Sequence, residues 1–133
     1  MASNRRDFLK ATGALALFSI VPAKVLGGAK HVAPSDQLTK GIIGVGGIGR
    51  SSYHFTSDEH CRLVSVCDVD QLHLQQALEL GRSKFGENLN AHHDFRNLIN
   101  DPNVDVVHIA TPPHWHALMA IEAAKAGKDI WCE

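Results

Sequence analysis

The segment Ile42-Ile43-Gly44-Val45-Gly46-Gly47-Ile48-Gly49 decides the fold that we predict for this chain. Its glycines follow the spacing G-x-G-x-x-G, between an apolar strand predicted over residues 42–45 and a helix expected to begin over residues 50–55. The first glycine permits a tight turn, the second lets backbone N–H groups approach a pyrophosphate, and the last lets the helix pack closely against the strand. This order predicts a dinucleotide-binding unit. Its predicted cofactor-binding residues are Gly44, Gly46, Gly47, Ile48 and Gly49.

An acidic residue supports the same interpretation. A second apolar strand, predicted over residues 63–67, is followed by Asp68, which lies 19 residues after Gly49. A carboxylate at this place accepts hydrogen bonds from the hydroxyl groups of an adenosine ribose and repels a 2′-phosphate. The next residue, Val69, offers no positive charge to such a phosphate. The pattern therefore favours NAD over NADP, and the alternatives are a flavin, which shares the glycine spacing, and a glycine turn without a ligand.

Short apolar runs alternate with longer helical segments along the rest of the chain. Further strands are predicted over residues 89–91, 104–110 and 129–132, and helices over residues 69–84, 95–99 and 114–126. Asp94 is the expected N-cap of the short helix, and Gly86 and Gly127 are expected to end the two longer ones. Such alternation is typical of βαβ units with a parallel sheet. The predicted fold class is therefore α/β, a Rossmann-type doubly wound parallel sheet.

The composition excludes several classes of protein. The 133 residues suit one globular domain, and 13 basic residues against 14 acidic ones, a net charge of -1, predict no nucleic-acid partner. Three cysteines are too few for a disulfide framework. Because the predicted strands place Cys61, Cys67 and Cys132 poorly for a bridge, we expect three free thiols.

Nine histidines are the unusual feature of the composition. They show no zinc-finger spacing, and His114 and His116 would point in different directions from a helix start, so we predict no metal site. His108 lies inside an apolar strand and is expected to be a hydrogen-bonded residue of the core.

The N-terminal region differs from the rest of the chain. Residues 1–29 hold the paired arginines Arg5 and Arg6, then a weakly apolar run, then small residues at 27–29. The segment looks like a twin-arginine export signal with cleavage near residues 27–29, and the alternative is an amphipathic first helix of the fold. The resemblance implies passage through the twin-arginine translocation machinery and a periplasmic or secreted location. The folded domain is then expected over residues 38–133.

Six motifs, in the same order, resemble the N-terminal NAD(P)-binding domain of the Gfo/Idh/MocA oxidoreductases, the family of glucose-fructose oxidoreductase and inositol dehydrogenase. These motifs lie at residues 43–49, 66–70, 94–99, 101–105, 109–116 and 124–133. The resemblance extends from Thr39 to Glu133. Together with the export signal, it indicates an exported branch of that family.

The resemblance also implies further site residues. Thr111 and Pro112 would line the cofactor cleft at the end of the fourth strand, and His116 would lie near the cofactor at the start of the next helix. Glu133 would open a Glu-Lys-Pro motif beside the nicotinamide. The lysine of that motif and the substrate domain of the family would follow Glu133. We therefore expect no catalytic residue in this chain, and we expect it to bind a dinucleotide without turnover.

The leading hypothesis is the NAD(P)-binding domain of an exported oxidoreductase that transfers a hydride between NAD(P) and a hydroxyl group of a sugar or polyol. The sugar-like substrate would need the missing C-terminal domain, and a homo-oligomer of the full-length protein is compatible with this hypothesis. Two alternatives stay open. The first is the cofactor domain of an NAD-dependent glycosidase of the same family, and the second is a stand-alone dinucleotide-binding module without catalysis.

Overall fold

A computed structural model describes residues 32–51 and 53–133. The predicted export signal over residues 1–29 lies outside the described residues, and the fold below is that of the compact unit Pro34–Glu133. No helix among the described residues is both long enough and apolar enough to span a membrane.

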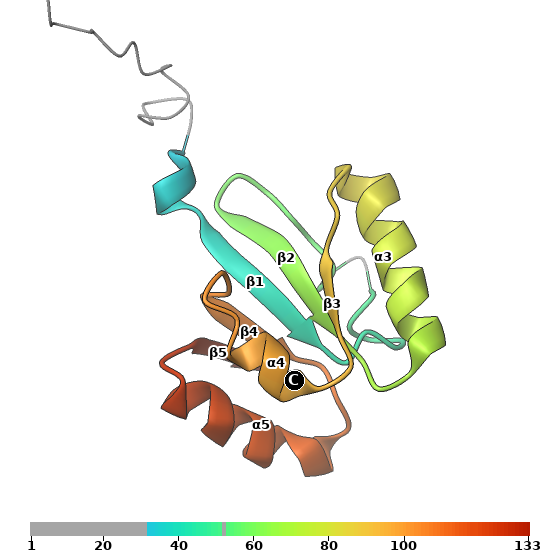
Figure 1. Cartoon of the computed structure of the whole chain (residues 1–133), viewed down its shortest axis with the longest axis vertical. Coiled ribbons are helices and arrows are strands. Elements are labelled where there is room, and N and C mark those ends of the chain that lie inside the picture. The colour runs from blue at the N-terminus through green and yellow to red at the C-terminus, as the bar shows by residue number, and fades with distance from the viewer. Residues whose placement is uncertain (1–31, 52) are drawn as a thin grey trace, which may run out of the picture. The chain divides into compact units, whose positions relative to one another are not determined.

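Five strands form one parallel sheet in the order β3-β2-β1-β4-β5 (Figure 1). The strands are β1 (Leu38–Ile43), β2 (Cys61–Cys67), β3 (Asn90–His92), β4 (Val106–Ile109) and β5 (Asp129–Cys132). The order reverses between β1 and β4, which is the place where open sheets of this type bind ligands. The predicted Rossmann-type fold is confirmed. The first strand runs from Leu38 to Ile43 and not over the predicted residues 42–45, so Gly44 and Val45 belong to the following turn.

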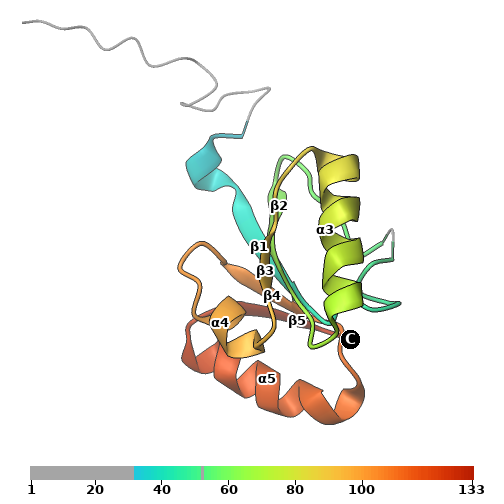
Figure 2. The same ribbon diagram turned by 45° about the vertical axis from the view of Figure 1, so that its right-hand side comes forward.

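Helices cover both faces of the sheet (Figure 2). They are α3 (Gln71–Phe85), α4 (Phe95–Ile99) and α5 (Pro113–Lys125), preceded by the short 3-10 helix η1 (Pro34–Asp36). Helix α3 packs on one face around Leu74 and Ala77, and α4 and α5 pack on the other face around Leu98 and Met119. Asp94 caps α4, as predicted, because its carboxylate accepts a hydrogen bond from the Arg96 N–H.

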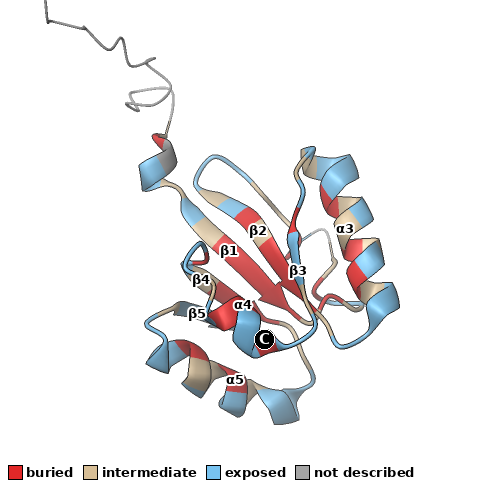
Figure 3. Ribbon diagram, in the orientation of Figure 1, coloured by how far each residue is buried: buried red, intermediate tan, exposed pale blue. Residues whose placement is uncertain are grey.

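Burial is concentrated on the inner strands (Figure 3). Ile42 and Ile43 are neighbours in β1 whose side chains enter the two different clusters of the core, and both are buried. Strand β1 is therefore covered on both faces, as expected for the centre of a parallel sheet. All four residues of β5 are exposed, so this strand is an open edge of the sheet in the described part of the chain.

The helix expected to begin over residues 50–55 is not formed, and that prediction is wrong. The described residues of this segment make turns, in which the Ser51 N–H donates to the Ile48 carbonyl and the Phe55 N–H donates to the Ser51 carbonyl. The ammonium groups of Lys40 and Lys84 donate to the carbonyls of His54 and Phe55. The His54 carbonyl also accepts the Thr56 N–H, so these contacts stabilise a turn and not a regular helix.

The three cysteines are free thiols, as predicted. Cys67 is buried at the end of β2, and burial raises the pKa of its thiol to about 12. Cys61 begins the same strand, and burial also raises its pKa. The thiolate form needed for reaction is therefore disfavoured at both positions in β2.

Candidate functional site

A cavity of about 890 Å³ opens at the carboxyl ends of the strands. Loops that follow β1, β2, β3 and β4 line it, together with Glu133 at the end of β5. The predicted site residues in its wall are Gly44, Gly46, Gly47, Ile48, Asp68, Thr111, Pro112 and Glu133. The other two predicted residues, Gly49 and His116, do not line it. The fold thus brings eight of the ten predicted site residues together at one edge of the sheet.

Two glycines of the turn over residues 44–49 are required by its backbone. Gly44 has a φ of 89°, and a Cβ there would lie 2.7 Å from the carbonyl oxygen of Ala110. A Cβ at Gly49 would lie 1.9 Å from the carbonyl oxygen of Gly44. The close approach predicted at Gly49 is therefore present, but it is made to the turn itself, because no regular helix follows.

The middle of the same turn presents free backbone groups. At Gly47 an added Cβ would meet nothing within 4 Å, so this part of the backbone borders open space. Among the described residues, no hydrogen-bond acceptor is found for the backbone N–H groups of Gly46, Gly47 and Ile48. Consecutive N–H donors without protein partners suit the oxygen atoms of a pyrophosphate.

Asp68 connects the glycine turn to the start of α3. Its Oδ2 atom accepts a hydrogen bond of 2.9 Å from the Val45 N–H, and its Oδ1 atom accepts one of 2.9 Å from the Asp70 N–H. A carboxylate has about four acceptor positions, so it can still accept from a ligand hydroxyl. The following residue, Val69, is 88% exposed at the cavity wall. Asp68 is therefore placed as the sequence predicted.

Two polar residues of the cavity wall were not predicted from the sequence. His73 and Arg96 lie there, each in the first turn of a helix that starts at the carboxyl edge of the sheet. Both residues closely follow the capping residues Asp70 and Asp94, and this position in the sequence could have predicted that they lie at the carboxyl edge. Arg96 Nη1 lies 3.3 Å from Oδ1 of Asp94, the residue that caps α4, so the Asp94 carboxylate partly offsets the positive charge of Arg96.

His116 acts on the loop between β4 and α5. Its Nε2 atom lies 2.6 Å from the carbonyl oxygen of Thr111, and the Thr111 hydroxyl donates to Met119 Sδ at 3.6 Å. His116 therefore holds the backbone of Thr111 in place, while Thr111, Pro112 and Trp115 form the cavity wall.

Glu133 faces the cavity and is paired with a histidine. Its Oε2 atom lies 2.8 Å from Nε2 of His54, and its backbone N–H donates to the Ile109 carbonyl. His108 lies beside this pair and is fully buried, as predicted. The prediction that it is hydrogen-bonded is wrong, because neither ring nitrogen has a partner among the described residues. Burial, with the neighbouring His54, lowers the pKa of His108 to about 4, so its ring is neutral at pH 7.

Comparison with known proteins decides the family. Residues 38–133 match the sequence model of the Gfo/Idh/MocA family, described as an oxidoreductase family with an NAD-binding Rossmann fold. This chain belongs to that family. The Gfo/Idh/MocA domain begins at β1 and includes every residue of the cavity wall.

Curated relatives of this Gfo/Idh/MocA domain include two proteins named as glycosyl hydrolases. Glycosyl hydrolase family 109 protein 2 of Shewanella sp. (strain ANA-3) is 42% identical over 108 residues, which cover 77% of this chain and 24% of that protein. The glycosyl hydrolase family 109 protein of Shewanella baltica (strain OS195) is 33% identical over 152 residues, covering 98% of this chain and 33% of that protein. The chain thus spans about a quarter to a third of the length of these relatives.

Solved structures share the fold of the Gfo/Idh/MocA domain. A probable dehydrogenase from Thermotoga maritima is 31% identical with a TM-score of 0.60, covering 71% of this chain and 27% of that one. The myo-inositol dehydrogenase of Lactobacillus casei, solved with NAD(H) and myo-inositol, gives a TM-score of 0.62 at 23% identity, covering 72% of this chain and 28% of that one. The chain is an NAD-binding Rossmann domain, and the cavity at its carboxyl edge fits a dinucleotide in size and in polar groups.

Proposed function

We propose that this domain binds NAD in preference to NADP and serves an exported enzyme that acts on a carbohydrate. The observation that supports the cofactor preference is the Asp68 carboxylate, which lies in the cavity wall beside the glycine turn. A negative charge there accepts hydrogen bonds from ribose hydroxyls and repels a 2′-phosphate.

In this proposal different residues of the chain bind different parts of the dinucleotide. The N–H groups of Gly46, Gly47 and Ile48 would hold the pyrophosphate, and Asp68 would hold the adenosine ribose. Arg96 is the cation in the wall that could favour a 2′-phosphate, and its pairing with Asp94 weakens that attraction.

The other end of the cavity would receive the nicotinamide. Thr111 and Pro112 at the end of β4, with Glu133 at the end of β5, form its wall. Bound NAD+ supplies a hydride acceptor. In our proposal these residues position the ring and exclude water, and the groups that hold the substrate and move its proton lie outside residues 1–133.

A titration tests the cofactor preference. NAD+ and NADP+ are added to the parent chain and to Asp68→Asn, with heat as the readout. We expect the parent to prefer NAD+, and we expect Asp68→Asn to reduce that preference at least tenfold, because the substitution removes one charge while it keeps the acceptor for Val45.

Asp129→Asn is the matched control, since it removes the same charge from an exposed residue at the start of β5. It should leave both affinities unchanged. A parent chain that binds NADP+ as tightly as NAD+ would contradict the role given to Asp68.

For the whole enzyme we propose hydride transfer from a secondary hydroxyl carbon of a sugar or polyol. A second candidate is an NAD-dependent glycosidase, in which oxidation of the sugar is transient, and the 42% identity to a protein named as a family 109 glycosyl hydrolase favours it. A version extended through the substrate domain separates the two. Net accumulation of NADH supports the dehydrogenase, and cleavage of a glycoside without NADH accumulation supports the glycosidase.

Export through the twin-arginine machinery is part of the same proposal. It is supported by Arg5 and Arg6 and by the order of charged, apolar and small residues after them. An Arg5→Lys, Arg6→Lys double variant should remain in the cytoplasmic fraction, while the parent reaches the periplasm. Equal export of both proteins would exclude this route.

A further inference from the structure

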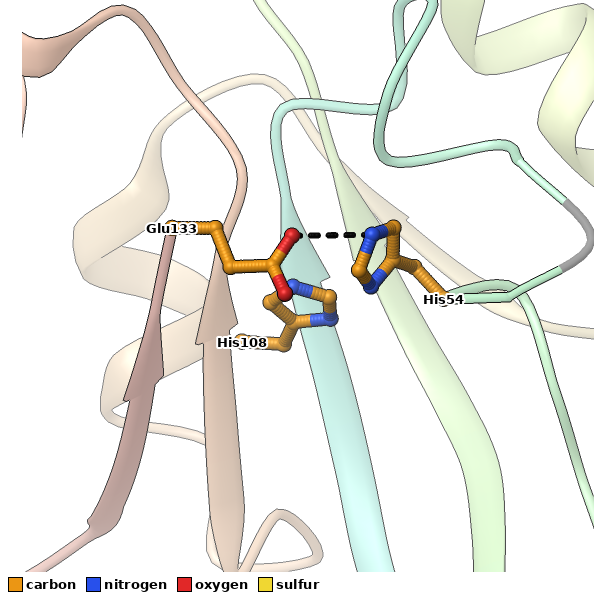
Figure 4. A group of neighbouring side chains, drawn as sticks. All are labelled: His54, His108 and Glu133. Carbon is orange, nitrogen blue, oxygen red and sulfur yellow. Dashed lines mark ion pairs between the residues drawn. The ribbon is translucent and has the colours of Figure 1, made fainter.

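Three segments that are distant in the sequence bring metal-binding side chains together. His54 comes from the turn that follows the glycine motif, His108 from β4, and Glu133 from the residue after β5 (Figure 4). One donor atom from each lies within 4.8 Å of the other two. Figure 4 shows the Glu133 carboxylate directed at His54, with the His108 ring beside it.

Three of the four histidine ring nitrogens of this cluster have no hydrogen-bond partner among the described residues. His108 is fully buried, and neither of its ring nitrogens has a hydrogen-bond partner among the described residues. The Nδ1 atom of His54, a residue only 8% exposed, also has none. A buried nitrogen without a partner costs free energy, so its retention calls for a ligand that the protein itself does not provide.

Packing holds both rings in place. The His108 ring stacks on Trp131 with centroids 5.2 Å apart, and the His54 ring lies 4.9 Å from the His108 ring. Lys40, whose positive charge acts on His108, directs its ammonium group at the His54 carbonyl and the Thr56 hydroxyl. The turn that carries His54 is therefore fixed, and the nearby positive charge is bound to that turn.

We propose that His54, His108 and Glu133 form a site for a divalent transition metal, with Zn²⁺ as the best match. Two neutral imidazoles and one carboxylate are a ligand set that zinc uses when it keeps one position open. Tetrahedral ligand atoms at about 2.1 Å from the ion lie roughly 3.4 Å apart. The present separations, from 2.8 Å to at most 4.8 Å, bracket that value, so small ring rotations bring the donors into place.

The site also has access to solvent. The Glu133 side chain is 36% exposed and belongs to the wall of the large cavity. Through it an ion can enter, and a water molecule can take the fourth position. The proposal does not rest on NAD binding, because all three donors belong to the chain itself.

Zinc binding to the full chain tests the proposal. The chain is first treated with a chelator and dialysed, then titrated calorimetrically with Zn²⁺, and separately with Co²⁺ followed by its visible absorption. We expect one Zn²⁺ per chain at this site and a tetrahedral Co²⁺ spectrum. Glu133→Gln and His108→Phe should each weaken Zn²⁺ binding at least tenfold, and His60→Gln should not, since the His60 side chain is 75% exposed and outside the cluster.

Folding is checked separately from binding. Glu133→Gln changes an exposed carboxylate at the end of an edge strand, so it should fold like the parent by circular dichroism. Zn²⁺ should raise the Tm of the parent and of His60→Gln, but not that of folded Glu133→Gln. If the parent binds no Zn²⁺, or if folded Glu133→Gln binds it as tightly as the parent, then the cluster is only an ion pair beside a buried histidine and the proposal is wrong.

Discussion

Each end of the sheet carries a cavity, but the two cavities differ in how their polar groups are hydrogen-bonded. At the amino end of the strands lies a cavity of about 510 Å³, and two of its lining residues, Thr39 and Asp105, are hydrogen-bonded to each other. Asp105 Oδ2 accepts from both the N–H and the hydroxyl of Thr39, at 2.8 Å and 2.7 Å. At the carboxyl end the N–H groups in the middle of the glycine turn have no acceptor among the described residues.

The direction of the chain explains this difference. In a parallel sheet each strand ends at the same edge, and α3, α4 and α5 each start at that edge after β2, β3 and β4. At that edge Asp70 and Asp94 cap the starts of α3 and α4, whereas the N–H groups in the middle of the glycine turn have no acceptor among the described residues. The carboxyl edge therefore offers backbone N–H donors without a partner among the described residues, while Thr39 and Asp105 at the amino edge bond to each other.

The largest effect is expected from a substitution in the glycine turn. Gly49→Ala should destabilise the domain by at least ~3 kcal/mol and abolish dinucleotide binding, because its Cβ would lie 1.9 Å from the Gly44 carbonyl oxygen. Urea unfolding measures the stability. Gly47→Ala is the matched control, since its Cβ meets nothing within 4 Å, and its stability should stay within about 0.5 kcal/mol of the parent. Equal losses in the two variants would show that the turn is not as tight as described.

A smaller effect is expected at the amino end. Thr39→Val removes the hydroxyl that donates to Asp105 and should cost about 1 kcal/mol in the free energy of unfolding, while it leaves NAD affinity unchanged. Urea unfolding and calorimetric titration of the same samples check both parts. A loss of NAD affinity would break the proposed separation between the two ends.

The effect of Thr39→Val should also depend on pH. The hydrogen bonds from Thr39 lower the pKa of Asp105 below its ordinary value of 3.8. Because the folded-state pKa is lowered, this contribution is present above pH 3.8 and is lost as the pH falls through the lowered value. The stability difference between parent and variant should therefore shrink in acid, and a difference that grows below pH 4 would contradict this cause.

The smallest expected effect concerns Arg96, an exposed cation of the carboxyl end. Arg96→Gln should change the affinities for NAD+ and NADP+ by less than about threefold, since an exposed ion pair with Asp94 offsets the charge. Titration of both dinucleotides measures it. A selective loss of NADP+ binding would instead show that Arg96 contacts the 2′-phosphate. The carboxyl end would then bind its ligand through a side-chain cation as well as through backbone N–H groups.

Local patterns predicted most of the fold because they act over few residues. The edge strand over residues 129–132 and the cap at Asp94 follow from runs of apolar residues and from a single side chain. No helix follows Gly49, where one was predicted. In that segment Lys40 from β1 and Lys84 from α3 donate to the carbonyls of His54 and Phe55, and no local signal reveals those contacts.

The sequence predicted those parts of the candidate site that depend on the order of the strands, but not the contacts between side chains. Placing Gly44, Asp68 and Thr111 at one edge needs only the strand order. His54 and Glu133 are far apart in the sequence. They meet because His54 follows β1, Glu133 follows β5, and only β4 lies between these two strands in the sheet. The same distance explains why the histidines showed no metal-binding spacing.

The central position of β1 has a consequence for folding during synthesis. Its partner β2 follows closely in the chain, but its other partner, β4, pairs through Thr39 and Asp105, which are 66 residues apart. The growing chain can therefore assemble β1, β2, α3 and β3 while the other side of β1 still lacks a neighbour. An open, apolar strand edge is a template for pairing with other chains. We expect nascent chains that end shortly before β4 to be the most prone to aggregation, until residues 106–109 emerge and close that edge.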